Sequence, residues 1–183
     1  MRNLDWLVYT YRHRRAFEYC VQKRIQDPRL RAELLRRARI HDMDKMVMYL
    51  FMDQQKAQLM HIQTQPHHLE NNLPRTYMDL VETVIDYECA PYTKPDKPLN
   101  AYEFVLKLMD VAVLERAVGE KLIEIMRKLD IARPRTIVED AEGLAYCASI
   151  GPVSEEILLA EILQYIDENR DNSLRLALEH MEM

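Results

Sequence analysis

Five of the six histidines lie within the first 68 residues, and they alternate with aspartates in an order that suits metal binding. The order along the chain is His13, His41 followed directly by Asp42, His61, the pair His67 and His68, and then Asp86. Neutral imidazoles and carboxylates suit zinc, iron or manganese, and a two-metal site needs about six of them converging from different helices. Because a carboxylate can bridge two ions, Asp42 could join two metals while His41 binds one. The spacing therefore predicts a metal site.

The same order resembles the HD superfamily, whose helical domains supply ligands in the chain order H, HD, H, H, D. The resemblance covers residues 13–86. The segment HDMDK also matches the HDxxK form of the family, in which the lysine approaches the anionic group of the substrate, and the resemblance gives that role to Lys45. The run H-x5-HH followed by E-x3-D-[WY] is similar to an uncharacterised HD-like family of bacteria and phages. Here those residues are His61, His67, His68, Glu82, Asp86 and Tyr87.

Two positions depart from the pattern of these families. Asp44 occupies a position where HD-like families usually have glycine, and Tyr87 stands where the related family tends to have tryptophan. The aspartate changes the surroundings of the HDxxK lysine, but it does not remove a ligand.

Each candidate ligand also has an ordinary structural interpretation. His13 lies on an apolar helical stripe and would then be a core histidine, while Asp42 would only cap a following helix. His61 would be a surface histidine, and Asp86 would belong to a solvated acidic stripe. The ordered set as a whole favours ligation. The expected metal ligands are His13, His41, Asp42, His61, His68 and Asp86.

The adjacent histidines His67 and His68 have side chains that diverge. At least one is expected to be a ligand, and the other would contact the substrate or donate a hydrogen bond to a ligand. We assign the ligand role to His68 and the substrate contact to His67, with the reverse left open. Glu82 lies one helical turn before Asp86, which favours a supporting role beside the last ligand.

A carboxylate-bridged metal pair lowers the pKa of a bound water and stabilises charge that develops on a phosphate. The expected function is therefore a metal-dependent phosphohydrolase acting on a nucleotide or other small phosphoester, with two divalent ions drawn from Fe, Mn, Zn, Ni or Co. Asp42 and Lys45 are the predicted catalytic residues. Lys45 would neutralise the phosphate, and Arg12, Arg14 or Arg15 would add charge at the entrance, with Arg12 assigned to substrate binding.

Two alternatives remain open at this stage. The resemblance also admits mixed-valence di-iron oxygenases of the HD type, which use the same six-ligand pattern to activate dioxygen. The second alternative is a non-catalytic helical module whose histidines bind a structural metal or none. The chain has no Gly-rich phosphate loop and no nucleophile elbow, which argues against kinase-like, Rossmann and α/β-hydrolase chemistry.

Composition and periodicity predict that helices position these residues. Only three glycines occur among 183 residues, whereas Leu, Met, Glu, Arg and Ala are plentiful, so an all-α fold is expected. An Asn100–Glu103 capping box would open the longest helix after the first 100 residues, and Ser154 would cap another. The expected helices are 3–26, 29–40 with a possible continuation toward 52, 54–63, one between Pro74 and Pro91, 101–129, 137–149, 154–169, and one from about 172.

Length and charge suggest one domain with two parts. Residues 1–130 would form an HD-like, metal-binding helical bundle, and residues 131–183 would add helices that support or cover it. Basic residues concentrate near the N-terminus, where they could attract a phosphate-bearing substrate or simply form solvated helix faces. The net charge of -5 and the scarcity of aromatic–basic clusters do not support nucleic-acid binding.

The cysteines and the hydropathy pattern indicate a soluble cytoplasmic protein. Cys20, Cys89 and Cys147 are odd in number and form no CxxC pair, so reduced and mostly buried thiols are expected. Neither a signal-peptide-like start nor an apolar run of membrane-spanning length occurs, so no membrane partner is expected. Homo-oligomerisation stays open.

Overall fold

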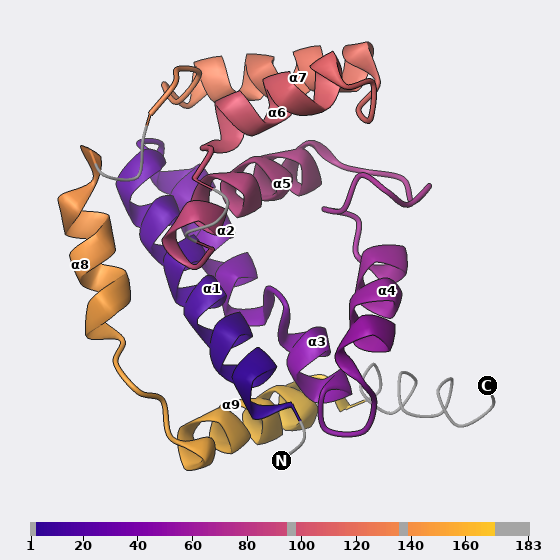
Figure 1. Ribbon diagram of the computed structural model, residues 1–183, viewed down its shortest axis with the longest axis vertical. Helices are drawn as coiled ribbons and strands as arrows, with labels where there is room; N and C mark the ends of the chain where they lie inside the picture. The colour runs from indigo at the N-terminus through magenta and orange to yellow at the C-terminus, as the bar shows by residue number, and fades with distance from the viewer. Residues whose placement is uncertain (1–2, 95–97, 136–138, 171–183) are drawn as a thin grey trace.

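The computed structural model describes residues 3–94, 98–135 and 139–170, and the regular elements within these ranges are helical (Figure 1). The expected all-α fold is confirmed. The elements are α1 (Leu4–Arg24), α2 (Pro28–Ile40), α3 (Met43–Met48), α4 (Gln54–Thr64), α5 (Tyr77–Cys89), the 3₁₀ turn η1 (Ala90–Tyr92), α6 (Ala101–Asp110), α7 (Arg116–Lys128), α8 (Ala141–Ser149) and α9 (Glu155–Glu168). None of these helices is long and apolar enough to cross a membrane.

Side-chain caps determine where several helices begin. Asp27 caps α2, whose first position is the proline Pro28. Thr76 and Asp79 form a reciprocal capping box at the start of α5. The predicted Ser154 cap is present at α9. Each cap contributes about 1 kcal/mol and fixes the register of the side chains that follow it.

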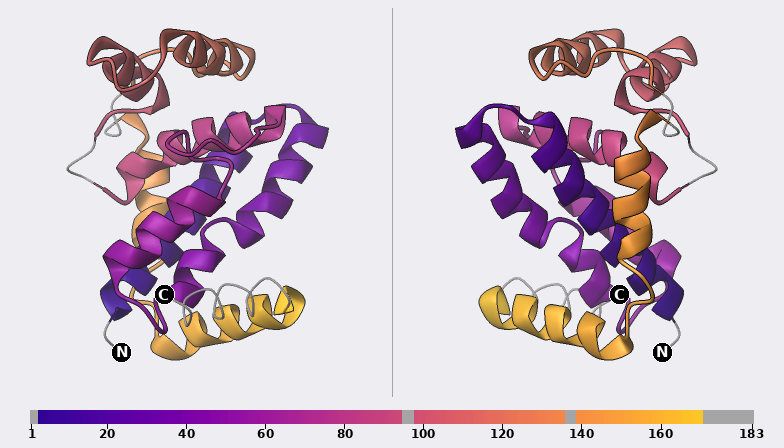
Figure 2. Two further views of the ribbon diagram at one scale, coloured as in Figure 1. Left: turned by 90° about the vertical axis from the view of Figure 1, so that its right-hand side faces the viewer. Right: turned by 90° about the vertical axis from the view of Figure 1, so that its left-hand side faces the viewer.

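Helix α1 runs through the middle of the molecule and contributes to two apolar clusters. The larger cluster joins the second half of α1 to α2, α5, α6 and α7, and the smaller joins the first half of α1 to α3 and α9. Figures 1 and 2 show α6 and α7 at one end of the molecule and α9 crossing the opposite end. Along α1, His13 lies between Leu7 of the smaller cluster and Phe17 of the larger. A buried polar side chain therefore lies at the boundary of two cores.

The residues His41 and Asp42 occupy a turn between two helices. Helix α2 ends at Ile40 and α3 begins at Met43, so neither residue lies inside a continuous helix. Asp42 is left-handed, with φ of 59°. This conformation costs a residue with a Cβ about 1–2 kcal/mol, although aspartate tolerates it better than most. The turn lets two adjacent side chains face the same interior space, which a straight helix would not allow.

The helix expected over residues 101–129 is two helices, α6 and α7, joined by a turn. Ala112 has φ of 55°, and its N–H and that of Val113 donate to the carbonyl oxygens of Met109 and Leu108, which is a Schellman ending. The turn contains no glycine or proline, so nothing in the sequence interrupts the helical spacing of apolar residues there. A single helix is therefore expected from the sequence. Folding back lets α6 and α7 pack against each other and against α5.

The predicted cap of this segment is present, because Asn100 accepts a hydrogen bond from the N–H of Glu103 at 3.1 Å. Close packing of the hairpin depends on Gly119, where a Cβ would lie 2.1 Å from the sulfur of Met109. The α6–α7 pair is therefore a fixed structural unit.

The C-terminal helices α8 and α9 pack against α1, and α9 also packs against α3. Arg14 and Arg15 on α1 each donate to Glu161 on α9 at 2.6 Å, and Arg14 also donates to the carbonyl oxygen of Arg39 at 2.6 Å. We call these three side chains the Glu161 clasp. Helix α8 begins at Ala141. Part of the helix expected over 137–149, the terminal helix expected from about 172, and His180 lie outside the described residues.

Candidate metal centre

The predicted ligands lie in one buried cluster, where α1, α4, α5, the loop after α4 and the α2–α3 turn meet. The Asp42 carboxylate is at its centre. Its Oδ1 atom lies 3.0 Å from His61 Nε2 and 3.9 Å from His41 Nε2. Its Oδ2 atom lies 4.0 Å from His13 Nε2 and 2.6 Å from Lys45 Nζ. The two oxygens therefore face different sets of groups.

The histidines form two groups around this carboxylate. His61, His67 and His68 offer ligand atoms that lie within 4.8 Å of one another, and His13, His41 and Asp42 do the same. Asp86 completes the second group, because its Oδ1 atom lies 2.7 Å from His13 Nε2 and 3.6 Å from His41 Nε2. The described residues thus contain two adjacent donor sets. His67 belongs to the first set beside His68, so both adjacent histidines lie in the cluster.

Carboxylates orient the histidine rings from the side away from the centre. His41 Nδ1 lies 3.1 Å from Glu82 Oε1, and the same oxygen lies 3.5 Å from His67 Nδ1. His61 Nδ1 lies 2.8 Å from Asp44 Oδ2. Histidines that bind metals usually donate their second ring nitrogen to a carboxylate or carbonyl in this way.

These carboxylates are themselves held in place. Arg37 on α2 donates to both Asp79 and Glu82 on α5, at 2.7 and 2.8 Å, and thereby fixes the two helices relative to each other. Gln65 donates to Asp44 at 2.9 Å. The loop after α4 is attached to α5 through Thr83, whose hydroxyl donates to a main-chain carbonyl oxygen of that loop at 2.5 Å.

Four imidazole nitrogens in the cluster are buried and have no hydrogen-bond partner among the described residues. They are the Nε2 atoms of His41, His61, His67 and His68. The 3.0 Å approach of His61 Nε2 to Asp42 does not have hydrogen-bond geometry. Leaving a buried polar atom unpaired costs about 1–3 kcal/mol. Four such atoms directed into one space beside carboxylates fit a bound metal ion, which would use their lone pairs.

The electrostatics of the cluster suit a cation. Burial alone raises the pKa of the Asp42 carboxyl, but the positive charges of Lys45 and His41 outweigh it and hold the pKa well below its usual range. Burial lowers the pKa of His41, but Asp42 and Asp86 outweigh burial and raise it to about 10. A proton therefore occupies the His41 imidazole when no metal is bound, and metal binding would release it.

The opposite balance applies to His67. Burial lowers its pKa, and the neighbouring charge of His41 lowers it further, to about 3. The ring is therefore neutral at pH 7 and keeps a lone pair for a ligand. Burial likewise lowers the pKa of His13 despite its contact with Asp86.

A cavity of about 1130 Å³ opens onto this cluster. His13, Lys45, His68 and Asp86 line one part of it, so the candidate ligands are accessible from the cavity. Lys94 also lines the cavity, where its ammonium lies 5.2 Å from the centre of the Tyr9 ring. A small anion in this part of the cavity would meet both lysines.

The predicted substrate-binding residues are placed differently from one another. Lys45 lines the cavity beside the cluster, as its assigned role requires. His67 is buried among the candidate ligands, where its free Nε2 suits ligation as well as substrate contact. Arg12 is not brought to the cluster: its guanidinium donates to the carbonyl oxygen of Gly151 at 3.0 Å on the exposed side of α1.

Sequence reasoning leaves Asp44 and Lys94 without a role. In the structure Asp44 holds the ring of His61 and is buried. Its signal in the sequence is a charged residue at a position where the families that the sequence resembles usually have glycine. Lys94 lies between two of the expected helices, and no pattern in that segment indicates a direction for its side chain.

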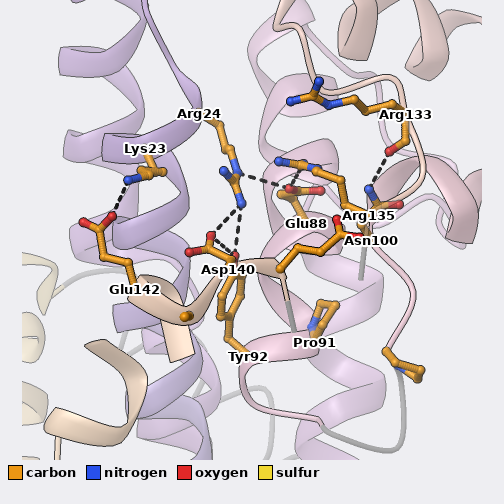
Figure 3. A pocket seen from close by; sticks show the side chains of 13 residues that line it. Lys23, Arg24, Glu88, Pro91, Tyr92, Asn100, Arg133, Arg135, Asp140 and Glu142 are labelled. Atoms are coloured by element: carbon orange, nitrogen blue, oxygen red, sulfur yellow. Dashed lines mark hydrogen bonds and ion pairs between the residues drawn. The ribbon is translucent and has the colours of Figure 1, made fainter. Parts of the chain in front are cut away.

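A second polar cluster lies at the C-terminal end of α1 and lines a cavity of about 500 Å³ (Figure 3). Arg24 donates to Asp140 at 2.8 Å and lies 3.3 Å from Glu88, which also pairs with Arg135. Tyr92 donates to Asp140 at 2.6 Å. Burial raises the pKa of Glu88, and the two guanidinium groups oppose this effect. We call these five residues the arginine cluster.

The geometry defines a buried site of imidazoles and carboxylates that could hold a metal ion. The comparisons with protein-family models, curated proteins and solved structures found no match to the chain. The arguments about function that follow therefore depend on the positions of the residues within this chain.

Proposed function

We propose that the protein is a metal-dependent phosphohydrolase of the HD type, acting on a nucleotide or other small phosphoester. One observation carries the proposal: the Asp42 carboxylate lies between two sets of buried histidines, and four of those histidines have an unpaired Nε2 atom. A bridging carboxylate with imidazoles on both sides is the donor arrangement that a two-metal hydrolase requires. The HDxxK segment and the chain order of the ligands support the same assignment.

Two sets of residues would hold the metals. His13, His41 and Asp86 would bind one ion, and His61 with His68, His67 or both would bind the other, while Asp42 would contact both. When bound, the metal pair would lower the pKa of a water molecule and stabilise negative charge on the phosphate. Glu82 and Asp44 would hold the imidazole rings in the orientation that ligation needs.

Lys45 would bind the phosphate. Burial lowers its pKa, but Asp42 outweighs burial and raises it, so the ammonium stays protonated throughout the physiological range. Its Nζ atom lies 2.6 Å from Asp42 and borders the cavity. A phosphate oxygen in the cavity would accept a hydrogen bond from this ammonium without any change in the backbone. Lys45 would also exclude a substrate that lacks negative charge at that position.

The test is elemental analysis of protein purified without chelator, together with hydrolysis of bis(p-nitrophenyl) phosphate and p-nitrophenyl phosphate. Wild-type protein should contain about two transition-metal equivalents, and His41→Ala and Asp42→Ala should lose metal and at least about 10³-fold in activity, because several kcal/mol of charge stabilisation disappears. Asp5→Ala, which removes an exposed acid of α1, is the matched control and should change neither value.

Circular dichroism establishes that each variant is folded, so that a loss of metal is not a loss of structure. Iron with oxygen consumption and no phosphoester hydrolysis would replace the proposal by a di-iron oxygenase. Failure to bind any metal under every supplementation would leave a non-catalytic helical module.

A further inference from the structure

The cavity beside the candidate metal centre extends well beyond the space that a phosphate needs. Its volume of about 1130 Å³ exceeds the usual upper size of a pocket for a drug-sized ligand, about 1,000 Å³. The candidate metal centre borders it through His13, Lys45 and Asp86. Helices α6 and α7 also line it, through residues that have no role in the metal centre. A substrate would therefore contact groups other than the reacting phosphate.

Apolar and aromatic side chains of α5, α6 and α7 also line the cavity. Leu80 and Tyr87 of α5 face the cavity, as do Phe104 and Leu108 of α6 and Val118 of α7. The rings of Tyr87 and Phe104 meet edge to face, with centroids 4.8 Å apart, which fixes their orientation. An apolar segment of a ligand would be removed from water along this wall, which stabilises the bound state.

Two lysines on the α6–α7 hairpin also line the cavity. Lys107 lies on α6 and Lys121 on α7, both are exposed, and neither has an ion pair or hydrogen bond from its ammonium group within the described residues. Elsewhere on α7, Arg116 pairs with Glu120 at 2.9 Å and Lys128 pairs with Glu124 at 2.8 Å, and neither cation lines the cavity. Lys107 and Lys121 therefore offer unpaired ammonium groups to a ligand in the cavity.

The acids in the cavity do not cancel its positive charge. Among the described residues, five cations line it, Lys45, Arg75, Lys94, Lys107 and Lys121, against three acids, Glu70, Asp86 and Glu115. Asp86 belongs to the candidate metal centre and Glu70 lies beside His68, so Glu115 is the one of these three acids that is left for the hairpin. A ligand that reaches the hairpin would find two cations there and one acid.

We propose that the substrate is a phosphoester with an apolar body and a second anionic group at its far end. The reacting phosphate would lie against Lys45 and the metal centre, the apolar body along the α5–α6 wall, and the second anion at Lys107 and Lys121. This inference rests on the proposed function, because it takes the metal centre as the place where the phosphate reacts. It adds the chemical class of the substrate.

Binding can be followed by a signal that does not depend on hydrolysis, because Trp6 is the single tryptophan of the chain and lines the cavity. Its fluorescence should report occupancy when ethyl phosphate, octyl phosphate or 1,8-octanediol bisphosphate is added to protein purified without chelator, at constant ionic strength. Octyl phosphate should bind at least about tenfold more tightly than ethyl phosphate because of its apolar chain. The bisphosphate should gain about another tenfold from its second anion. Butane-, hexane- and decanediol bisphosphates then give the preferred length.

The double variant Lys107→Gln/Lys121→Gln should reduce the advantage of the bisphosphate over octyl phosphate to less than about twofold and leave octyl phosphate binding unchanged. The double variant Arg116→Gln/Lys128→Gln removes the same number of positive charges from the α6–α7 hairpin, but away from the cavity. It should keep the full advantage of the bisphosphate over octyl phosphate.

Equal affinity for octyl phosphate and each bisphosphate, or an advantage that survives in the lysine variant, overturns the inference. If p-nitrophenyl phosphate is still hydrolysed in that case, the phosphohydrolase proposal stands and only the substrate class is wrong. If no phosphoester is hydrolysed but the bisphosphate preference depends on Lys107 and Lys121, the ligand class stands and the reaction is wrong.

Discussion

The candidate metal centre and the arginine cluster are both buried and rich in charge, but their charges are satisfied in different ways. In the arginine cluster, Arg24, Glu88, Arg135 and Asp140 each face a group of opposite charge (Figure 3). The Nε atoms of Arg24 and Arg135 lack a hydrogen bond, yet other nitrogens of the same guanidinium groups are paired. In the candidate metal centre, the Nδ1 atoms of His41 and His61 face carboxylates, but the Nε2 atoms of four imidazoles have no hydrogen-bond partner among the described residues and lie together in one cluster.

This difference separates a structural network from a site that needs a ligand. A network whose charges pair among themselves is complete in the folded chain and holds segments together. A cluster that leaves several buried nitrogens unpaired carries a desolvation cost, which a bound cation would offset. Burial and charge alone would not distinguish the arginine cluster from the candidate metal centre. The number of unpaired imidazole nitrogens does distinguish them.

The largest effect on this comparison is expected from Arg24→Met. It leaves the carboxylates of Glu88 and Asp140 with less compensation and should lower the free energy of unfolding by about 3 kcal/mol. Urea unfolding measures this change, while metal content per folded molecule should stay the same. Arg116→Met removes an exposed pair with Glu120 and should cost less than about 1 kcal/mol.

Adding Glu88→Gln to Arg24→Met removes the uncompensated charge and should restore part of the lost stability. No recovery in the double variant, or a loss of metal in the single one, would mean that the arginine cluster is not the independent structural network described above.

An intermediate effect is expected from Asp44→Asn, which acts on the metal centre through His61. Asparagine can still accept a hydrogen bond from His61 Nδ1, but the loss of charge makes the imidazole a weaker ligand. Metal affinity should fall by about 10–100-fold. Competition with a coloured chelator measures it, and Asp53→Asn at the cap of α4 is the matched control. An unchanged affinity would show that Asp44 does not support a ligand.

The smallest effect is expected from Asp140→Asn. Burial raises the pKa of Asp140, but hydrogen bonds from Tyr92, Gly143 and Tyr19 outweigh burial and lower it. A lowered pKa means that the charge stabilises the fold above the unfolded pKa of about 3.9 and that this contribution is lost as the pH falls. Wild type should exceed the variant by about 1 kcal/mol at pH 7, and this difference should shrink as the pH falls below about 3.9 and through the lowered folded pKa. Unfolding curves across this range measure the difference, and a gap independent of pH would contradict the argument.

Much of the fold, and the gathering of the candidate ligands in one cluster, could be predicted from the sequence. Helical periodicity and punctuation by Pro28, Pro74 and Pro91 place the first helices correctly, because these residues stop or start a helix through local geometry. The chain order of histidines and aspartates identifies residues that the structure brings together. The ligand roles themselves remain predictions until metal is measured.

Other features depend on contacts that periodicity does not record. The break between α6 and α7 falls at Ala112, where the gain from packing the hairpin outweighs the cost of a left-handed residue. Arg12 and Arg14 are close in sequence, yet one points to Gly151 on the surface and the other is buried beneath α9. Only the packing of the C-terminal helices decides between such positions.

The Glu161 clasp also concerns the order in which the chain is made. The ribosome has made every candidate ligand once it reaches residue 86, whereas Glu161 lies 75 residues further along the chain. A chain emerging from the ribosome therefore holds its complete donor set well before α9 can reach Arg14 and Arg15. Binding of a metal by the nascent chain would therefore be a separate event from the packing of α9 against α1.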